Sequence, residues 1–171
     1  MENNLSKQMI EALINNFNAN NNEFVISKTK NYIKKFPRVA ILYNLLGSSY
    51  QKIGEHEDAI NIFKSALKID PNNISFSNNL GNSYKYVLDY KKAELIFKKI
   101  IEKNPKYINA YINLGNIKRD VNNFDEAINL YNKADKISPK NYIILYSLAL
   151  AHQGIGNYEI AINLAKEVLY L

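Results

Sequence analysis

Small and apolar residues recur along this chain at the spacing of an α-helix. In one stretch they lie at positions i, i+3, i+4 and i+7, namely Tyr43, Leu46, Gly47 and Tyr50. At about 100° per residue, this spacing places them along one side of a helix. A second stretch with a matching stripe follows, as in residues 125–137. The pattern therefore predicts pairs of helices.

Turn residues separate the two helices of each pair. The turns are Gly54-Glu55, Leu88-Asp89, Asn122-Asn123 and Gly156-Asn157. Asp89, Asn123 and Asn157 are predicted to cap the second helix, because their side chains accept hydrogen bonds from the free N–H groups at a helix start. Each second helix is expected to stop before a proline, which cannot continue it.

The whole pattern repeats every 34 residues. The prolines show the period most clearly, since all four share one phase: Pro37, Pro71, Pro105 and Pro139. A Leu-Gly pair keeps the same step at residues 46–47, 80–81 and 114–115. The glycines, opposite Ala59, Ala93 and Ala127, are expected to let the two helices of a pair approach closely. No repeat covers its own apolar side, so the repeats must stack.

This unit resembles the tetratricopeptide repeat family. Its signature is W-x2-L-G-x2-Y, then A-x3-F, then P, and residues 43–71 match it with Tyr43 in place of Trp. The resemblance implies an all-α fold, a right-handed α-solenoid of antiparallel helix pairs. The last Tyr of the first motif is replaced by Lys118 and His152 in the later repeats, and we expect looser packing there.

The repeats predict one array over residues 1–171. Its expected parts are a degenerate capping repeat at 5–37, full repeats at 40–73, 74–107 and 108–141, and a truncated fourth repeat at 142–171. The last helix has no closing proline, and its apolar Leu164, Val168 and Leu169 would normally face another repeat. We therefore expect either a longer natural chain or a homo-oligomer formed through this uncapped C-terminal helix.

The amino-acid composition limits the classes of function that are expected for this chain. The net charge of +6 comes from 20 lysines and only two arginines against 16 acids, whereas nucleic-acid readers rely on arginine. A solvated helix surface is therefore the expected role of the lysines. No cysteine is present, which excludes disulfides and thiolate zinc sites. The N-terminal sequence is polar, so we expect neither a secretory signal nor a membrane segment, and a cytoplasmic protein.

No catalytic constellation stands out. The two histidines, His56 in an interhelical turn and His152 on a first-helix core position, have no carboxylate or cysteine at ligand spacing. A phosphate-binding glycine loop and a nucleophile motif are also missing. We predict no enzymatic activity, no cofactor and no metal.

Asparagines form a second stripe on the first helices, roughly opposite Leu80 and Leu114. In proteins similar to this family, the first helices line a concave groove, and an asparagine ladder there binds an extended peptide. An amide offers both a donor and an acceptor to a peptide backbone. The candidate peptide-binding residues are Asn44, Asn79, Asn82, Asn109, Asn113 and Asn116. Sequence bias is the alternative, since 27 of 171 residues are asparagine.

The ends of this stripe are apolar and leave two interpretations open. Ile41 and Leu45 in the first repeat, and Ile143 and Leu150 in the fourth, would either anchor a ligand or pack on neighbouring helices. The second interpretation is favoured.

Three functions remain. The leading hypothesis is a protein-interaction scaffold that binds a peptide or partner domain. The second is the substrate-recognition arm of a larger enzyme, because bacterial proteins with similar opening repeats continue into glycosyltransferase or sulfotransferase domains. The third and weakest is single-stranded RNA binding by the lysine-rich helix at residues 91–106.

Overall fold

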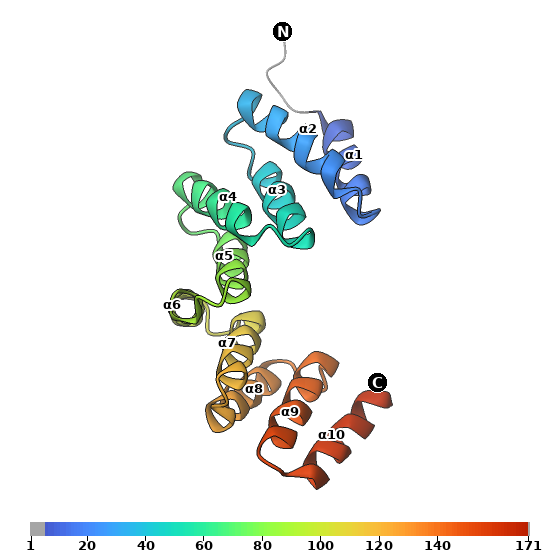
Figure 1. Ribbon diagram of the computed structural model, residues 1–171, viewed down its shortest axis with the longest axis vertical. Helices are drawn as coiled ribbons and strands as arrows, with labels where there is room; N and C mark the ends of the chain where they lie inside the picture. The colour runs from blue at the N-terminus through green and yellow to red at the C-terminus, as the bar shows by residue number, and fades with distance from the viewer. Residues whose placement is uncertain (1–5, 171) are drawn as a thin grey trace. The chain divides into compact units, whose positions relative to one another are not determined.

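A computed structural model describes residues 6–170, and within that range every regular element is an α-helix (Figure 1). The all-α fold predicted from the sequence is confirmed. The helices are α1 (Lys7–Asn18), α2 (Asn22–Lys35), α3 (Ala40–Lys52), α4 (His56–Ile69), α5 (Ile74–Tyr86), α6 (Tyr90–Lys103), α7 (Ile108–Asp120), α8 (Phe124–Ile137), α9 (Tyr142–Gly154) and α10 (Tyr158–Leu169).

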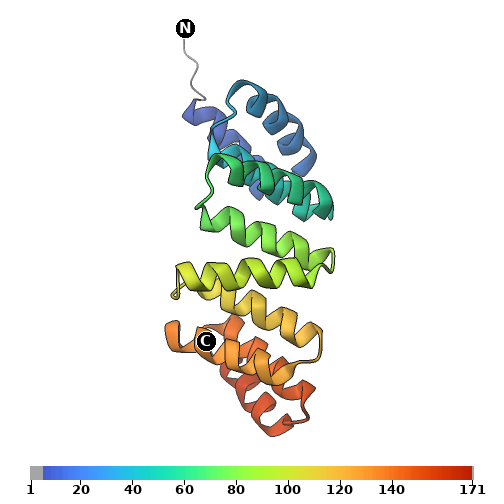
Figure 2. The same ribbon diagram turned by 90° about the vertical axis from the view of Figure 1, so that its left-hand side faces the viewer.

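The chain divides into two compact units, with the boundary between Asp89 and Tyr90. The N-terminal unit contains α1 to α5 and the C-terminal unit contains α6 to α10. Within each unit, consecutive helices run antiparallel and pack on one another (Figures 1 and 2). The odd-numbered helices are the first helices of the predicted pairs and the even-numbered helices are the second.

The helix bounds fit the predicted repeats, but the unit boundary falls inside the repeat at 74–107, between its two helices. A single array over the whole chain therefore stays a prediction. Residue 5 of the predicted capping repeat and Leu171 of the fourth repeat lie outside the described residues.

The turn between the two helices of each pair needs a left-handed residue. The backbone φ is near +60° or +80° at five positions in one phase of the repeat, namely Asn20, Gly54, Leu88, Asn122 and Gly156. Glycine and asparagine tolerate this conformation, whereas leucine is strained there. Of the predicted caps, Asn123 is confirmed, since its side chain accepts a hydrogen bond from the Glu126 N–H at 3.3 Å. Asn157 occupies the cap position without a side-chain hydrogen bond.

Two of the Leu-Gly pairs, at residues 46–47 and 114–115, let an aromatic ring pass directly over a helix backbone. A Cβ atom added to Gly47 would lie 2.5 Å from Cζ of Phe63, and one added to Gly115 would lie 2.5 Å from Cε1 of Tyr131. The close approach is thus confirmed, but its main partner is the aromatic ring of the second helix rather than the alanine. Both rings are fully buried.

The capping repeat completes the core of the N-terminal unit. Leu13 of α1 and Val25 of α2 form a buried cluster with Leu42 and Leu45 of α3, and Ile41 packs against the same cluster. Ile41 and Leu45 therefore pack on the capping repeat, as favoured from the sequence, and do not form a ligand anchor.

Lysines of the second helices lie over tyrosines of the following first helices. The Nζ atom of Lys30 is 5.3 Å from the centre of the Tyr50 ring, and Lys64 is 5.6 Å from Tyr84. These two pairs are related by the 34-residue repeat. Cation–π attraction therefore links neighbouring repeats at equivalent positions.

The C-terminal unit replaces this pair with an ion network. Here the equivalent positions carry two lysines, Lys98 and Lys118, which would repel each other. Glu94 lies between them, with Oε1 2.6 Å from Lys98 Nζ and 3.0 Å from Lys118 Nζ. Lys118 also pairs with Glu126 at 3.2 Å, and its side chain is only 12% exposed. The expectation of loose packing at Lys118 was therefore wrong.

Burial and hydrogen bonding act in opposite directions on this network. Burial alone would raise the pKa of Glu94, but hydrogen bonds from Lys98 and Lys118 outweigh it and hold that pKa below its ordinary value. Burial alone would lower the pKa of Lys118, but its bonds to Glu94 and Glu126 raise that pKa instead. Glu94 and Lys118 are therefore both charged at neutral pH.

The close approach at Gly47 predicts a specific packing defect. Gly47→Ala should lower the free energy of unfolding by about 1 to 3 kcal/mol, because the new methyl group overlaps the Phe63 ring. Adding Phe63→Leu to Gly47→Ala should recover part of that loss. Urea unfolding followed by circular dichroism measures both. Ser48→Ala, one residue away, serves as the control, and a Gly47→Ala protein as stable as the native one contradicts the packing.

The ion network predicts a pH-dependent contribution to stability. Glu94→Gln should lower the free energy of unfolding by about 1 kcal/mol at neutral pH. Because the folded-state pKa of Glu94 lies below the ordinary 4.5, the contribution is present above that value and is lost as the pH falls through the folded-state pKa. The difference from the native protein should therefore shrink in acid. Glu102→Gln on the same helix should change stability little at any pH.

Candidate functional site

The first-helix side of the N-terminal unit brings residues of two consecutive first helices together. Ser48 and Lys52 of α3, with Asn82 and Tyr86 of α5, line one open pocket of about 530 Å³. We call this the first-helix pocket. It is also lined by Phe17, Gln51, Gly54 and His56. Of the six asparagines predicted to bind peptide, Asn82 lines this pocket.

One wall of the first-helix pocket comes from the capping repeat. The ring of Phe17, at the end of α1, lies beneath Lys52, whose Nζ is 3.8 Å from the ring centre. The same Nζ donates hydrogen bonds to the backbone oxygen of Phe17 at 2.9 Å and to Oδ1 of Asn20 at 3.0 Å. An ammonium group has three donors, so one remains for a ligand. Lys52 is thereby fixed as a cation at the edge of an aromatic surface.

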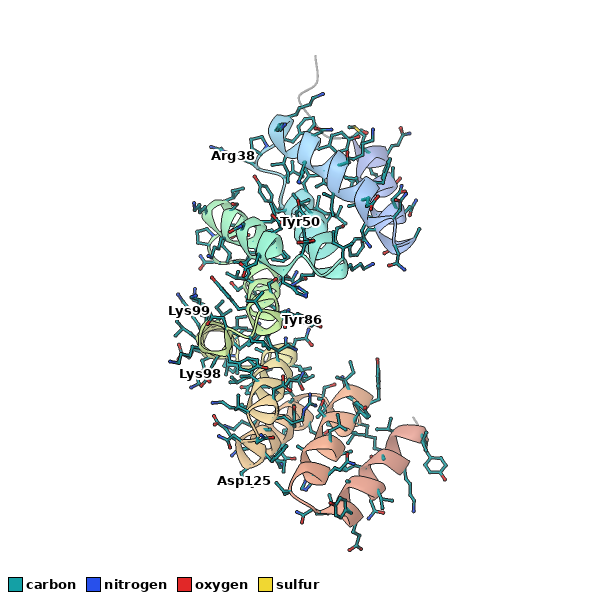
Figure 3. All side chains as sticks on the ribbon, in the orientation of Figure 1. Arg38, Tyr50, Tyr86, Lys98, Lys99 and Asp125 are labelled. Atoms are coloured by element: carbon teal, nitrogen blue, oxygen red, sulfur yellow. The ribbon has the colours of Figure 1, made fainter. Side chains whose placement is uncertain are left out.

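The opposite wall is a pair of stacked rings. The ring of His56 lies parallel to that of Tyr86, with centroids 4.5 Å apart and an interplanar angle of 5°. His56 is the first residue of α4, not part of the turn as predicted. Tyr86, labelled in Figure 3, is 59% exposed. The stack therefore presents a flat aromatic surface to the pocket.

Two side-chain atoms of residues that line the first-helix pocket have no hydrogen-bond partner within the part of the chain that the structure describes. They are Nδ1 of His56 and Oδ1 of Asn82, and both are shielded from solvent. A buried polar atom without a partner costs free energy. The pocket thus combines aromatic rings, a fixed cation and the polar side chains of Asn82 and His56.

Asn44 and Asn79 join the first helices of consecutive repeats. Nδ2 of Asn79 donates to Oδ1 of Asn44 at 3.0 Å, which links α5 to α3. Gln51 strengthens the link, since its Nε2 donates to the backbone oxygen of Asn79 at 2.9 Å and to Oγ of Ser83 at 2.8 Å. The amide nitrogen of Asn44 is not used in that pair. These two asparagines therefore form a structural contact and still present an amide donor.

The remaining candidates lie on α7 in the C-terminal unit. Asn109 is exposed and Asn113 is half-buried. Asn116 is engaged within its own repeat, because its Oδ1 accepts a hydrogen bond from the Tyr131 hydroxyl at 2.8 Å. Burial raises the pKa of Tyr131 to about 12, so this hydroxyl keeps its proton at neutral pH. One ladder through all six asparagines stays a prediction.

Sequence reasoning missed His56 as part of the site, although a signal existed. After the capping repeat, the residues at its phase are all aromatic: His56, Tyr90, Phe124 and Tyr158. In the C-terminal unit, Phe124 packs closely against Gly154, which is the position equivalent to Tyr86. The start of a second helix thus contacts the end of the next first helix in both units. Only where that end carries a ring does a stacked wall form.

The sequence pattern also does not predict Phe17 as part of the site. Nothing in its repeat phase reveals the contact, since Gln51 and Lys85 stand at the equivalent positions. Its role follows from Lys52, which reaches back across to α1.

The C-terminal helix α10 is largely exposed. Leu164 and Val168 of the predicted unpaired side are half-buried, whereas Leu169 is 83% exposed. The homo-oligomer expected through this helix stays a prediction.

Neither a metal site nor a membrane span is found in the described residues. Within 6–170, no group of three or more His, Asp or Glu side chains is placed to hold a metal ion. Over the same range, no helix is both long enough and apolar enough to cross a membrane.

Stacked helix pairs with an open pocket on their first-helix side define a helical-repeat protein. Two family models match the chain in sequence. The one described as "TPR repeat" matches residues 47–85 and 115–156, and the one described as "Tetratricopeptide repeat" matches residues 96–129. Together they cover more than half of the chain. The chain belongs to the tetratricopeptide repeat family.

Solved structures of MamA share this fold. One crystal structure of MamA is 24% identical to this chain with a TM-score of 0.76, and the match covers 98% of this chain and 95% of the MamA chain. MamA from Desulfovibrio magneticus RS-1, residues 41 to the end, is 17% identical with a TM-score of 0.79, covering 94% and 91%. At these identities the likeness shows the fold, an α-solenoid. None of the curated proteins matches the chain in sequence.

The hydrogen bond between Asn44 and Asn79 predicts a measurable coupling. A double-mutant cycle with Asn44→Ala and Asn79→Ala should give an interaction energy of about 0.5 to 1.5 kcal/mol in urea unfolding, because the amide pair is partly shielded from water. Asn109→Ala, at an exposed position of α7, should cost little. Strict additivity of the two changes would show that the pair does not stabilise the fold.

Proposed function

We propose that this protein is an interaction scaffold that binds an extended peptide segment on the first-helix side of its N-terminal unit. One observation carries the proposal. Residues of two consecutive first helices line the same open pocket, where an aromatic surface lies beside the Lys52 ammonium group and the Asn82 amide. A concave site with an apolar surface and a few polar groups is typical of ligand binding.

Each feature of the first-helix pocket suits one part of a peptide. The rings of Phe17 and Tyr86 provide surfaces for one apolar side chain of the ligand. The side-chain amide of Asn82 suits a peptide group of the ligand, while the remaining donor of Lys52 suits a carbonyl or carboxylate. The amide nitrogen of Asn44 offers a further donor to a peptide carbonyl, as the predicted ladder requires.

The expected affinity is moderate. Burying one large apolar side chain contributes about 1.5 to 3 kcal/mol, and each hydrogen bond about 0.5 to 1.5 kcal/mol. Micromolar binding needs about 8 kcal/mol, so both kinds of contact are required. The binding of a short linear segment is the mode that such a site supports.

The alternative of a recognition arm in a larger enzyme would use the same pocket. Its partner would then be a peptide substrate rather than a free protein, and the contacts of this chain would be unchanged. No described feature favours RNA binding over this proposal. Lys98, labelled in Figure 3 beside Lys99 on α6, is paired with Glu94 at 2.6 Å.

The proposal is tested with peptides selected by display against the purified chain. The tightest peptide should shift the NMR signals of residues at the first-helix pocket. Tyr86→Ala should weaken its binding about tenfold, which corresponds to about 1.4 kcal/mol, and Asn82→Ala about fivefold. Tyr86 is well exposed, so its removal should leave the fold intact.

Tyr158→Ala provides a matched control, because this tyrosine is 63% exposed and lies in the C-terminal unit. It should bind the peptide like the native protein. Unchanged affinity of both the Tyr86→Ala and Asn82→Ala proteins, with native circular dichroism, would rule out the first-helix pocket as the site.

A further inference from the structure

We propose that the second-helix side of the N-terminal unit carries a separate docking site for an acidic segment of a partner protein with one large apolar side chain. The site is an open hollow of about 540 Å³ between α2, α3 and α4. We call it the second-helix hollow. It shares no lining residue with the first-helix pocket.

The floor of the second-helix hollow is apolar. It is formed by Tyr43 and Leu46 of α3, which are 7% and 1% exposed, with Ile33 of α2 and Ile62 of α4 at its sides. The Tyr43 hydroxyl is occupied, because it donates to the backbone oxygen of Pro37 at 2.8 Å. The floor therefore offers no free polar group, and an apolar side chain is the occupant that it favours.

Small residues keep the second-helix hollow open. Ser27 of α2 and Ser65 of α4 stand on its rim, and both are exposed. The Ser65 hydroxyl bonds back to the Asn61 carbonyl of its own helix at 2.9 Å, so it does not reach across the opening. At the equivalent positions 68 residues later the chain carries Leu95 and Lys133. Because larger residues stand at these equivalent positions, the hollow is not a feature that every repeat shares.

The rim is positively charged. Lys30 and Lys34 of α2 line the opening, and Lys34 forms no ion pair with any described residue. Lys30 is held beside Tyr50, with its Nζ 5.3 Å from the ring centre. The pKa of Lys30 is raised chiefly by the side-chain contact with Tyr50 and also by Asp58 of α4, so it stays cationic.

The net charge of helix α2 as a whole is also positive. Helix α2 carries four lysines and a single acid, Glu23. Opposite it, α4 begins with Glu57 and Asp58, of which Asp58 acts on Lys30. The remaining excess of positive charge at the rim complements carboxylates, and charge complementarity of this kind selects a partner and speeds its association.

Size and openness indicate a peptide as the occupant. The volume of the second-helix hollow lies within the range of ligand sites, roughly 300 to 1,000 Å³. An opening between two exposed helices admits a side chain from a passing polypeptide, whose flanking carboxylates then reach Lys30 and Lys34. We therefore assign to this hollow a segment in which Leu or Phe is flanked by Asp or Glu.

The probe for this site is the peptide acetyl-Glu-Glu-Leu-Phe-Glu-Glu-amide, titrated into the ¹⁵N-labelled full chain. It should shift the signals of residues around the second-helix hollow, and its affinity should fall severalfold between about 50 and about 500 mM salt. Two control peptides are used, one with Gln for each Glu and one with Ser for Leu and Phe. Both should bind at least fivefold more weakly.

Two protein variants locate the site. Ser65→Leu should fill the hollow, and Lys34→Glu should reverse the charge of one residue on its rim. Each change should therefore lower the affinity for the probe peptide at least fivefold. Lys68→Leu on α4 and Lys35→Glu on α2 are matched controls, because both lysines are exposed and neither lines the hollow. Circular dichroism checks that all four variants remain folded.

The proposal is overturned by any of three results. These are the absence of saturable shifts, equal binding of the glutamine peptide, and a Lys35→Glu protein that loses as much affinity as Lys34→Glu. Shifts confined to Phe17, Asn82 and Tyr86 would also refute it, while supporting the first-helix pocket as the peptide site. The two proposals therefore fail separately.

Discussion

The contact of an aromatic ring with a helix glycine is the constraint on which the rest of this structure depends. Phe63 lies on Gly47 and Tyr131 lies on Gly115, so the two helices of a pair sit closer than side chains at those positions would permit. This approach fixes each first helix relative to its second helix. In the N-terminal unit it positions α3, which supplies Ser48, Gln51 and Lys52 to the first-helix pocket. The fold thus gains rigidity from the same residues that give the repeat its sequence signature.

The period of the sequence predicted the helices and their pairing because those features recur every 34 residues. Contacts that break the period could not be predicted in the same way. Phe17 reaches the first-helix pocket because Lys52 bridges back to the atypical capping repeat, a contact with no counterpart elsewhere in the pattern. His56 belongs to a periodic aromatic series, yet its stack with Tyr86 exists only because a ring happens to stand at that helix end.

Polar residues on the first helices do two things at once. Asn44 and Asn79 bond to each other across two repeats and leave amide groups toward solvent, whereas Asn116 is drawn into its own repeat by Tyr131. A stripe read from sequence treats these residues as equivalent. The structure separates them by what lies within hydrogen-bond distance, which depends on the second helix. Sequence spacing predicts on which side of a helix a residue lies, but it does not predict which group the side chain bonds to.

The exchange of Tyr50 and Tyr84 for Lys118 has a consequence for assembly of the chain. Near-identical repeats are able to dock in the wrong order, displaced by one whole unit, because their apolar surfaces are alike. Lys118 pairs with Glu94 on the preceding helix, and the other positions in the phase of Glu94 carry Ile26, Ile60, Ile128 and Ile162. A displaced α7 would bring the Lys118 ammonium group against isoleucine and leave it with Glu126 as its one carboxylate partner, which costs free energy. The one irregular repeat thereby disfavours stacking of the repeats in the wrong order.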